Sequence, residues 1–283
     1  MRRKIMVLFL IILTFHMVIF GKVYGDMGPK PTLEILVENA PKSLYYLDLL
    51  VDYTSEHLYQ YIEEEELEFK DIFYTLKNYN VDGWRPALVT GTRVPLFGKL
   101  AGIDEGSLKR HSFSYLGVPD RFKIIIVTGD NEIIVSENVL DRKAFNTVVR
   151  FDCNTKLIKE ENYILPTIKQ FIATGLTTLI IEGLILLLFR FSLKKNWKPF
   201  IIINMATQLL LSLIINISVF YKGIMLAVLA YAAFEWVILI TESILFSKYL
   251  EGHTKKRRVF YAITANLASF ASGIVIMLQS TLG

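Results

Sequence analysis

The sequence predicts an exported α+β domain followed by an all-α bundle of four transmembrane helices. Uneven charge is the first observation behind this fold class, because residues 26–165 hold 23 of the 27 Asp and Glu but only 16 of the 31 Lys and Arg. The second is the apolar character of the rest of the chain, which makes the whole 53% hydrophobic. The sequence pI near 8.9 averages these two unlike parts, so it gives no support for nucleic-acid binding.

Residues 1–25 have the pattern of a secretory signal peptide. Three basic residues at positions 2–4 precede an apolar stretch, and small residues lie just before Asp26. Lys22 and Tyr24 make the cleavage site imperfect, so an uncleaved anchor is the alternative. Both interpretations place the domain that follows, residues 26–165, outside the cytoplasm.

The cysteine content indicates a bacterial protein. Cys153 is the only cysteine, so the chain forms no internal disulfide. Exported domains of this size without disulfides are more typical of a bacterial surface than of a eukaryotic secretory pathway. We therefore expect a multi-pass protein of the bacterial plasma membrane.

Alternating and β-branched runs predict a sheet in the exported domain. The expected strands are 33–37, 112–116, 122–128, 132–137 and 145–151. Gly129, Asp130 and Asn131 separate two of these strands and indicate a hairpin. The span 43–78 is expected to be mostly helical, which makes the domain α+β.

No catalytic motif occurs in the exported domain. His57 and His111 are isolated, and no metal-binding, nucleophile-elbow or phosphate-loop pattern surrounds them. We therefore predict no catalytic residue, no metal, no cofactor and no enzyme activity. The Gly- and Pro-rich segment 82–102 is either a binding loop or a segment that packs against the sheet.

The domain 166–283 contains four apolar runs, each long enough to cross a membrane. Crossing ~30 Å of hydrocarbon takes ~20 helical residues. The predicted spans are about 167–191, 199–220, 223–247 and 259–282. Lys and Arg gather in the first and third connectors, and cytoplasmic loops carry the positive excess. These two connectors are therefore expected inside, and the C-terminus outside.

Polar side chains inside the apolar runs form a hypothetical buried site. Glu235 and Glu242 are seven residues apart, so they lie on one helix face about 10 Å apart along the axis. Glu235 is near mid-membrane, and the other members share a depth in the cytoplasmic half. The predicted members are Glu182, Asn204, Gln208, Glu235, Glu242 and Asn266.

Two interpretations of this site remain open. Amide and hydroxyl side chains often hydrogen-bond across membrane helices and act as structural links. A carboxyl group costs more than an amide in the bilayer, and no Lys or Arg lies in the apolar interior to pair with it. The alternative is a site for proton or cation coupling, or for a polar ligand.

Several stretches resemble a group of multi-pass membrane proteins of low-GC Gram-positive bacteria for which no activity is established. They are DMGPKP at 26–31, YYLDLL at 45–50, ANLASFASG at 265–273, and the spaced residues Phe113, Tyr115, Pro119, Phe122, Lys123 and Ile124. The resemblance implies membrane location and architecture only, and it assigns no catalytic residue.

Three function classes follow from the sequence. The first is a protein whose exported domain senses or binds an extracytoplasmic ligand and is coupled to the bundle. The second is a small ion-coupled transporter, or a transporter subunit, that uses the intramembrane glutamates. The third, an intramembrane enzyme, lacks an intramembrane Asp, His or Cys to support it. Expected partners are the lipid bilayer and either a second copy of the chain or another membrane subunit.

Overall fold

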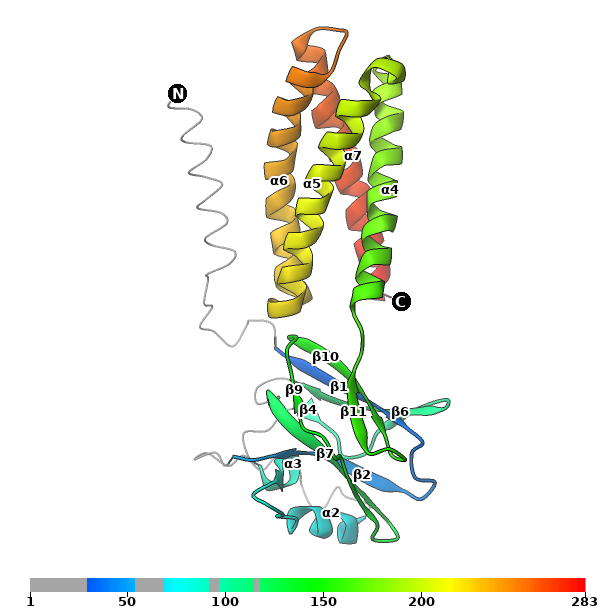
Figure 1. Ribbon diagram of the computed structural model, residues 1–283, viewed down its shortest axis with the longest axis vertical. Coiled ribbons are helices and arrows are strands. Elements are labelled where there is room, and N and C mark those ends of the chain that lie inside the picture. The colour runs from blue at the N-terminus through cyan, green and yellow to red at the C-terminus, as the bar shows by residue number, and fades with distance from the viewer. Residues whose placement is uncertain (1–29, 54–68, 92–96, 115–117, 283) are drawn as a thin grey trace. The chain divides into compact units, whose positions relative to one another are not determined.

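The computed structural model divides the chain into two compact units. It describes residues 30–53, 69–91, 97–114 and 118–282, with side chains of the last helix described as far as Gly273. Pro29–Asn162 forms a unit built on β-sheets, and a second unit of long helices begins at Tyr163 (Figure 1). We call them the sheet unit and the helical unit. The predicted signal peptide, residues 1–25, lies outside the described residues.

Two sheets make up the sheet unit. Sheet A has the order β11-β10-β1-β6-β4, from Leu157–Glu160, Asn146–Asp152, Thr32–Glu38, Leu108–Ser114 and Phe97–Gly98, and β5 (Ile103–Glu105) pairs with β6. Sheet B has the order β3-β2-β7-β8, from Arg85–Pro86, Tyr45–Val51, Arg121–Thr128 and Ile133–Val135, and β9 (Leu140–Asp141) pairs with β7. Among the described strands, β1 and β10 pair in parallel and the other pairs are antiparallel.

Sheet A has one buried face, as the alternating sequence pattern predicts. Leu33, Ile35 and Val37 are fully buried, whereas Glu34 and Glu38 on the same strand are partly exposed. On the outer face, Arg110 pairs with Glu34 across β1 and β6, and charged neighbours repeat this pattern at β10. The predicted hairpin is also present, because β7 and β8 pair around the turn at Asn131, whose φ is 62°.

The helix expected over 43–78 is wrong for its first part. Tyr45–Val51 is strand β2, which lies between β3 and β7, and all seven of its residues are buried. A strand covered on both faces loses the alternation that identifies strands in sequence, so its apolar run was mistaken for a helix. Only α2, Lys70–Lys77, is helical in the later part of the span; residues 54–68 are outside the described residues.

One apolar cluster joins both sheets to the two short helices. It includes Phe113 from sheet A, Ile126 from sheet B, Phe73 from α2 and Leu88 from α3 (Ala87–Thr90). Sheet B therefore lies between sheet A on one side and the helices on the other (Figure 1). Within the segment 82–102, residues 87–89 are buried in this cluster, which supports packing for that part of the segment.

A fully buried carboxylate in β2 holds the start of α3. Asp48 is 0% exposed and accepts hydrogen bonds from the N–H groups of Leu49 at 2.7 Å, Leu88 at 3.0 Å and Val89 at 2.9 Å. The N–H groups of Leu88 and Val89 lie at the N-terminus of α3, where backbone donors have no partner within the helix. Burial raises the pKa of Asp48 to about 7, although the three hydrogen bonds act in the opposite direction.

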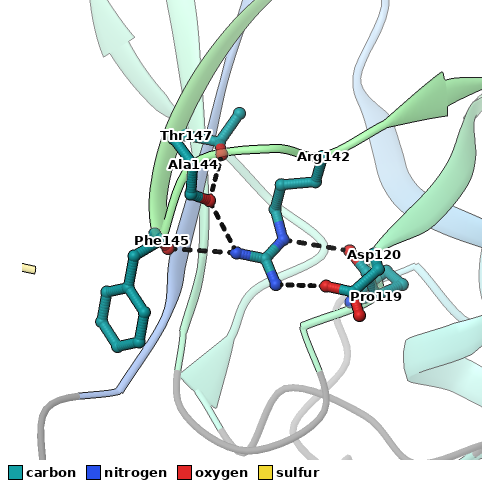
Figure 2. A network of polar contacts seen from close by, with 6 residues as sticks. All are labelled: Pro119, Asp120, Arg142, Ala144, Phe145 and Thr147. Atoms are coloured by element: carbon teal, nitrogen blue, oxygen red, sulfur yellow. Dashed lines mark hydrogen bonds and ion pairs between the residues drawn. The ribbon is translucent and has the colours of Figure 1, made fainter. Parts of the chain in front are cut away.

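Arg142 organises the connections that lead into β7 and β10. Figure 2 shows its guanidinium between Pro119 and Asp120 on one side and Ala144 and Phe145 on the other. It donates to the carbonyl oxygens of Ala144 at 2.9 Å and Phe145 at 3.1 Å, and to Asp120 Oδ1 at 2.6 Å. One planar cation thus satisfies acceptors from two loops that are distant in sequence.

The helical unit contains α4 (Ile164–Leu188), α5 (Leu193–Lys222), α6 (Ile224–Tyr249) and α7 (Lys255–Leu282). The first three are long and apolar enough to cross a membrane, which is compatible with a membrane protein. Large apolar side chains such as Leu188 and Leu209 are exposed on their outer surfaces, as lipid-facing positions require. Helix α7 packs against α4 and α6 (Figure 1), but a fourth membrane span remains a prediction.

The helix boundaries differ from the predicted spans mainly at α5. This helix begins at Leu193, six residues before the predicted start at Pro199, and the proline lies in its second turn. The predicted span followed the apolar run, whereas the helix also includes the mostly polar residues 193–198 that precede it. The difference brings Asn196 into the helix, where it is completely buried.

Asp48 should make the sheet unit less stable as the pH rises. Its pKa of about 7 in the folded state lies above the ordinary value of 3.8, so the unfolded chain releases the proton first. Stability from this group is complete below about pH 4 and is lost as the pH rises to about 7, by about 4 kcal/mol in total. We expect Asp48→Asn to remove this slope from urea unfolding of the fragment Pro29–Asn162.

The matched control is Asp52→Asn, one residue beyond β2, where the carboxylate is partly exposed. It should keep the wild-type slope between pH 4 and pH 7. An Asp48→Asn fragment with that same slope would show that another group is responsible.

Candidate functional site

Polar side chains of the helical unit face inward at one level of the bundle. Glu182, Asn204, Glu242 and Asn266 are each at most 3% exposed, and they come from α4, α5, α6 and α7 in turn. Around the bundle, α4 contacts α5, α5 contacts α6, α6 contacts α7, and α7 contacts α4. On α6 the buried residues recur every three or four positions, so Glu242 belongs to the stripe that packs.

Glu242 connects three helices through its two carboxyl oxygens. Thr207 Oγ1 on α5 lies 2.5 Å from Oε1, and Asn266 Nδ2 on α7 donates to Oε2 at 2.8 Å. Both partners also reach backbone carbonyl groups of their own helices, Thr207 that of Ile203 at 3.0 Å and Asn266 that of Ala262 at 2.9 Å. The carboxyl is thus bound at both oxygens by side chains that have further acceptors.

Glu182 is only partly satisfied. Ser269 Oγ on α7 lies 3.0 Å from its Oε1, and Asn204 lies beside the carboxyl. Its Oε2, both polar atoms of the Asn204 amide, and the Tyr261 hydroxyl form no hydrogen bond of ordinary geometry within the described residues. Such atoms, buried together, are unusual, since buried polar groups are nearly always paired. Electrostatic interactions link Glu182 to Glu242 and to Tyr261.

The other two predicted members lie at the margin of this site. Glu235 is half-buried, is hydrogen-bonded to Tyr231, and lines a small pocket of ≈ 30 Å³ together with Asn266. Gln208 is half-buried and packs beside Gly175 of α4. The structure therefore brings Glu182, Asn204, Glu242 and Asn266 together, with Glu235 and Gln208 at the edge.

Tyr261 was missed as a site residue. An aromatic residue close to a basic loop reads as an interfacial anchor, which is common at membrane surfaces. In the bundle its ring is fully buried against Phe191 and Phe246, with centroid distances of 5.6 and 5.4 Å. Its spacing of four residues from the small residue Ala265, one helical turn, was the available sequence signal.

A second missed residue, Asn196 in the first turn of α5, fastens this helix to the α6–α7 connector. Its amide donates to the carbonyl oxygen of Glu251 at 3.2 Å, and its oxygen accepts from the Glu251 N–H at 2.7 Å. Arg257 adds a bond to the Phe189 carbonyl oxygen at 2.8 Å. The α4–α5 and α6–α7 connectors therefore lie together at one end of the bundle, where their basic side chains are mostly exposed.

The sheet unit has a polar groove of its own. An open cavity of ≈ 350 Å³ lies between residues 40–45 and 104–109. Lys42, Lys109 and Asp104 contribute its charges, and the Lys109 ammonium lies 4.8 Å from the centre of the Tyr45 ring. Gly106, with φ of 65°, forms the turn on one side. The groove offers cationic and aromatic groups to a ligand.

Neither unit shows a metal centre or a reactive thiol in its described residues. No group of three or more His, Cys, Asp and Glu side chains there is arranged to hold a metal ion. Burial raises the pKa of the Cys153 thiol to about 12, so this thiol is not a nucleophile at neutral pH. Burial likewise lowers the pKa of His111 to about 3, which keeps the imidazole neutral.

Comparisons of the chain with protein-family models, with curated proteins and with solved structures find no match.

The contact of Gly273 with Tyr231 predicts a sensitive position. A Cβ at Gly273 would overlap the Tyr231 hydroxyl, which is bonded to Glu235, while the Tyr231 ring stacks on Phe270 at 5.5 Å. We expect Gly273→Ala to destabilise the bundle by about 1–3 kcal/mol, the usual range for overpacking. Thermal unfolding of the full chain in detergent measures this change.

Gly183→Ala is the control on α4, where the added Cβ meets the Phe200 ring at ordinary contact distances, Cζ at 3.5 Å and Cε1 at 3.8 Å. It should be neutral or stabilising, because alanine favours helix by about 1 kcal/mol over glycine. Equal losses in both variants would contradict a specific role for the Gly273 contact.

Proposed function

We propose that the chain is an integral protein of the bacterial plasma membrane, with an extracytoplasmic sheet unit that binds a ligand and a bundle of four transmembrane helices that responds through its buried polar site. The observation that carries the proposal is the bonding of Glu242 to Thr207 and Asn266. Thr207 and Glu242 lie inside helices suited to a membrane, and the bonds join α5, α6 and α7. Side-chain hydrogen bonds between helices help to hold their packing, so a change in these bonds can change how the helices pack.

The charge of the connectors supports the orientation. Exposed lysines and arginines gather at the end of the bundle where Asn196 bonds the α6–α7 connector, whereas the opposite end of α5 has Lys222 as its last residue. Cytoplasmic loops carry the positive excess, so this end is assigned to the cytoplasm. The start of α4 is then outside, which agrees with export of the sheet unit.

The groove supports ligand binding. Lys42 and Lys109 suit an anionic ligand, and cell-wall peptides carry carboxylates on the side of the membrane assigned to the sheet unit. The proposal includes no enzyme activity. A second copy or a partner subunit that covers the exposed apolar helix surfaces is part of the same proposal.

An ion-coupled transporter, or a subunit of one, is the second candidate. It is favoured by the unpaired Oε2 of Glu182 and the unpaired Asn204 amide, both within the bundle interior. If these groups served only to link the helices, each polar atom would have a hydrogen-bond partner. In a transport site, the same atoms bind the ion during part of the cycle.

Cysteine labelling tests the orientation. In a Cys153→Ser background, cysteines replacing Asp130 and Lys222 should react with a membrane-impermeant maleimide in intact cells. Cysteines replacing Lys195 and Lys256 should react only after permeabilisation. All four positions are exposed, so access depends on the side of the membrane. The opposite pattern would reverse the proposed topology.

Muropeptides, the soluble fragments of digested peptidoglycan, test the groove. They should raise the unfolding temperature of the full chain in nanodiscs by at least about 2 °C. Lys42→Glu should abolish the rise, whereas Lys159→Glu, an exposed lysine of β11 outside the groove, should leave it. A rise that survives Lys42→Glu, or no rise in the wild type, would contradict this binding site.

A further inference from the structure

The hydroxyl group of Thr207 has one hydrogen and more than one acceptor. Its Oγ1 lies 3.0 Å from the Ile203 carbonyl oxygen and 2.5 Å from Glu242 Oε1. When Glu242 is ionised, the hydroxyl donates to the carboxylate. When Glu242 is protonated at Oε1, the carboxyl donates to the hydroxyl, and the hydroxyl turns to the Ile203 carbonyl oxygen. The same heavy-atom positions serve both states.

Ser269 gives Glu182 the same arrangement. Its Oγ lies 3.0 Å from Glu182 Oε1 and 3.0 Å from the Asn266 carbonyl oxygen. A proton on the carboxyl therefore needs only a rotation of the serine hydroxyl. Each carboxyl is thus paired with a hydroxyl on another helix that can act as donor or acceptor.

The unpaired atoms at Glu182 are compatible with both charge states of its carboxyl. When Glu182 is ionised, the Asn204 Nδ2 amide can donate to Oε2. When Oε2 is protonated, it can donate to the Asn204 oxygen after the amide turns. Both groups are almost completely buried, so bulk water does not supply the bond.

The charges around the pair also favour one proton. The titratable groups facing it are Glu235 of α6, whose own partner is Tyr231, and Tyr261 of α7; α5 contributes only neutral side chains. No Lys, Arg or His lies among the described residues between these helices. Two ionised carboxyls close together would repel each other, and a single shared proton removes that repulsion.

We propose that Glu182 and Glu242 form a site for one exchangeable proton, so that the ligand of the buried polar site is a proton and not a metal ion. This inference rests on the proposed function in one respect: it takes the buried polar site of the bundle as the functional site. The proton is taken from water and returned to water. Asn266 bonds Glu242 and also lines the ≈ 30 Å³ pocket beside Glu235, which has room for about one water molecule at the edge of the site.

Infrared difference spectroscopy of the full chain in nanodiscs tests the proton directly. Asp48, whose pKa of about 7 falls in the range scanned, and Glu235, which neighbours the carboxyl pair, are first replaced by Asn and Gln. In this background, raising the pH from 5 to 9 should remove the carbonyl stretch of one carboxylic acid per chain. Glu182→Gln or Glu242→Gln should alter this band, and the double variant should abolish it. Ser269→Ala should shift its frequency, because the hydroxyl that bonds the carboxyl is gone. Glu251→Gln, an exposed glutamate in the α6–α7 connector, is the matched control and should leave the band unchanged.

Three results would overturn the inference: no carboxyl band that changes over this pH range, a band that persists in the double variant, or a band that follows NaCl concentration at constant pH. If a Glu182 or Glu242 variant fails to fold, the pH difference of the Asp48→Asn, Glu235→Gln background chain and its salt series still decide. Muropeptide stabilisation and cysteine topology do not depend on this proton. If these two experiments give the expected results and the infrared test does not, the proton site is wrong and the proposed function stands.

Discussion

The bundle depends on the need to satisfy polar groups where no water is present. Helices with outward leucines gain little from apolar contact with one another in lipid, so packing and a few hydrogen bonds set their register. Glu242 joins α6 to Thr207 and Asn266, and Ser269 joins α7 to Glu182 of α4. These bonds involve all four helices at one level. Asn196 then fixes one end, where it connects α5 to the α6–α7 connector.

The two units use buried carboxyl groups in different ways. Asp48 accepts from three backbone N–H groups, whose direction is fixed by the backbone. Glu242 accepts from Thr207 and Asn266, whose polar groups also reach backbone carbonyls of their own helices. Fixed donors make Asp48 a structural cap for α3. Donors with an alternative acceptor let Glu242 change state without unfolding its surroundings. The chemistry of the partners, more than burial, separates a cap from a site.

Local signals in the sequence predicted much of the fold. The length of the apolar runs located α4, α5 and α6, and the alternation of apolar and polar residues located β1 and β10. Each of these patterns is contained in the residues of the element that it predicts. Strand β2 was not predicted because both of its faces are buried, so its sequence lacks the alternation of apolar and polar residues that marks a strand. The shared level of Glu182 and Glu242 followed from the spans, but the pairing with Ser269 and the approach of Tyr261 depend on helix rotation. The groove joins loops about sixty residues apart in sequence, so no local pattern marks it.

The choice of glutamate separates a structural link from a proton site. A glutamine at 242 could donate its amide to Thr207, which would donate to Ile203, while its oxygen accepts from Asn266. That arrangement copies the protonated carboxyl and would hold the helices together equally well. Structural linkage alone thus gives glutamate no advantage over glutamine, and glutamate carries a cost in lipid when it ionises. What glutamate adds is the second state, in which the same hydroxyl reverses its hydrogen bond. The hydroxyl beside each carboxyl is therefore what makes ionisation compatible with an intact bundle.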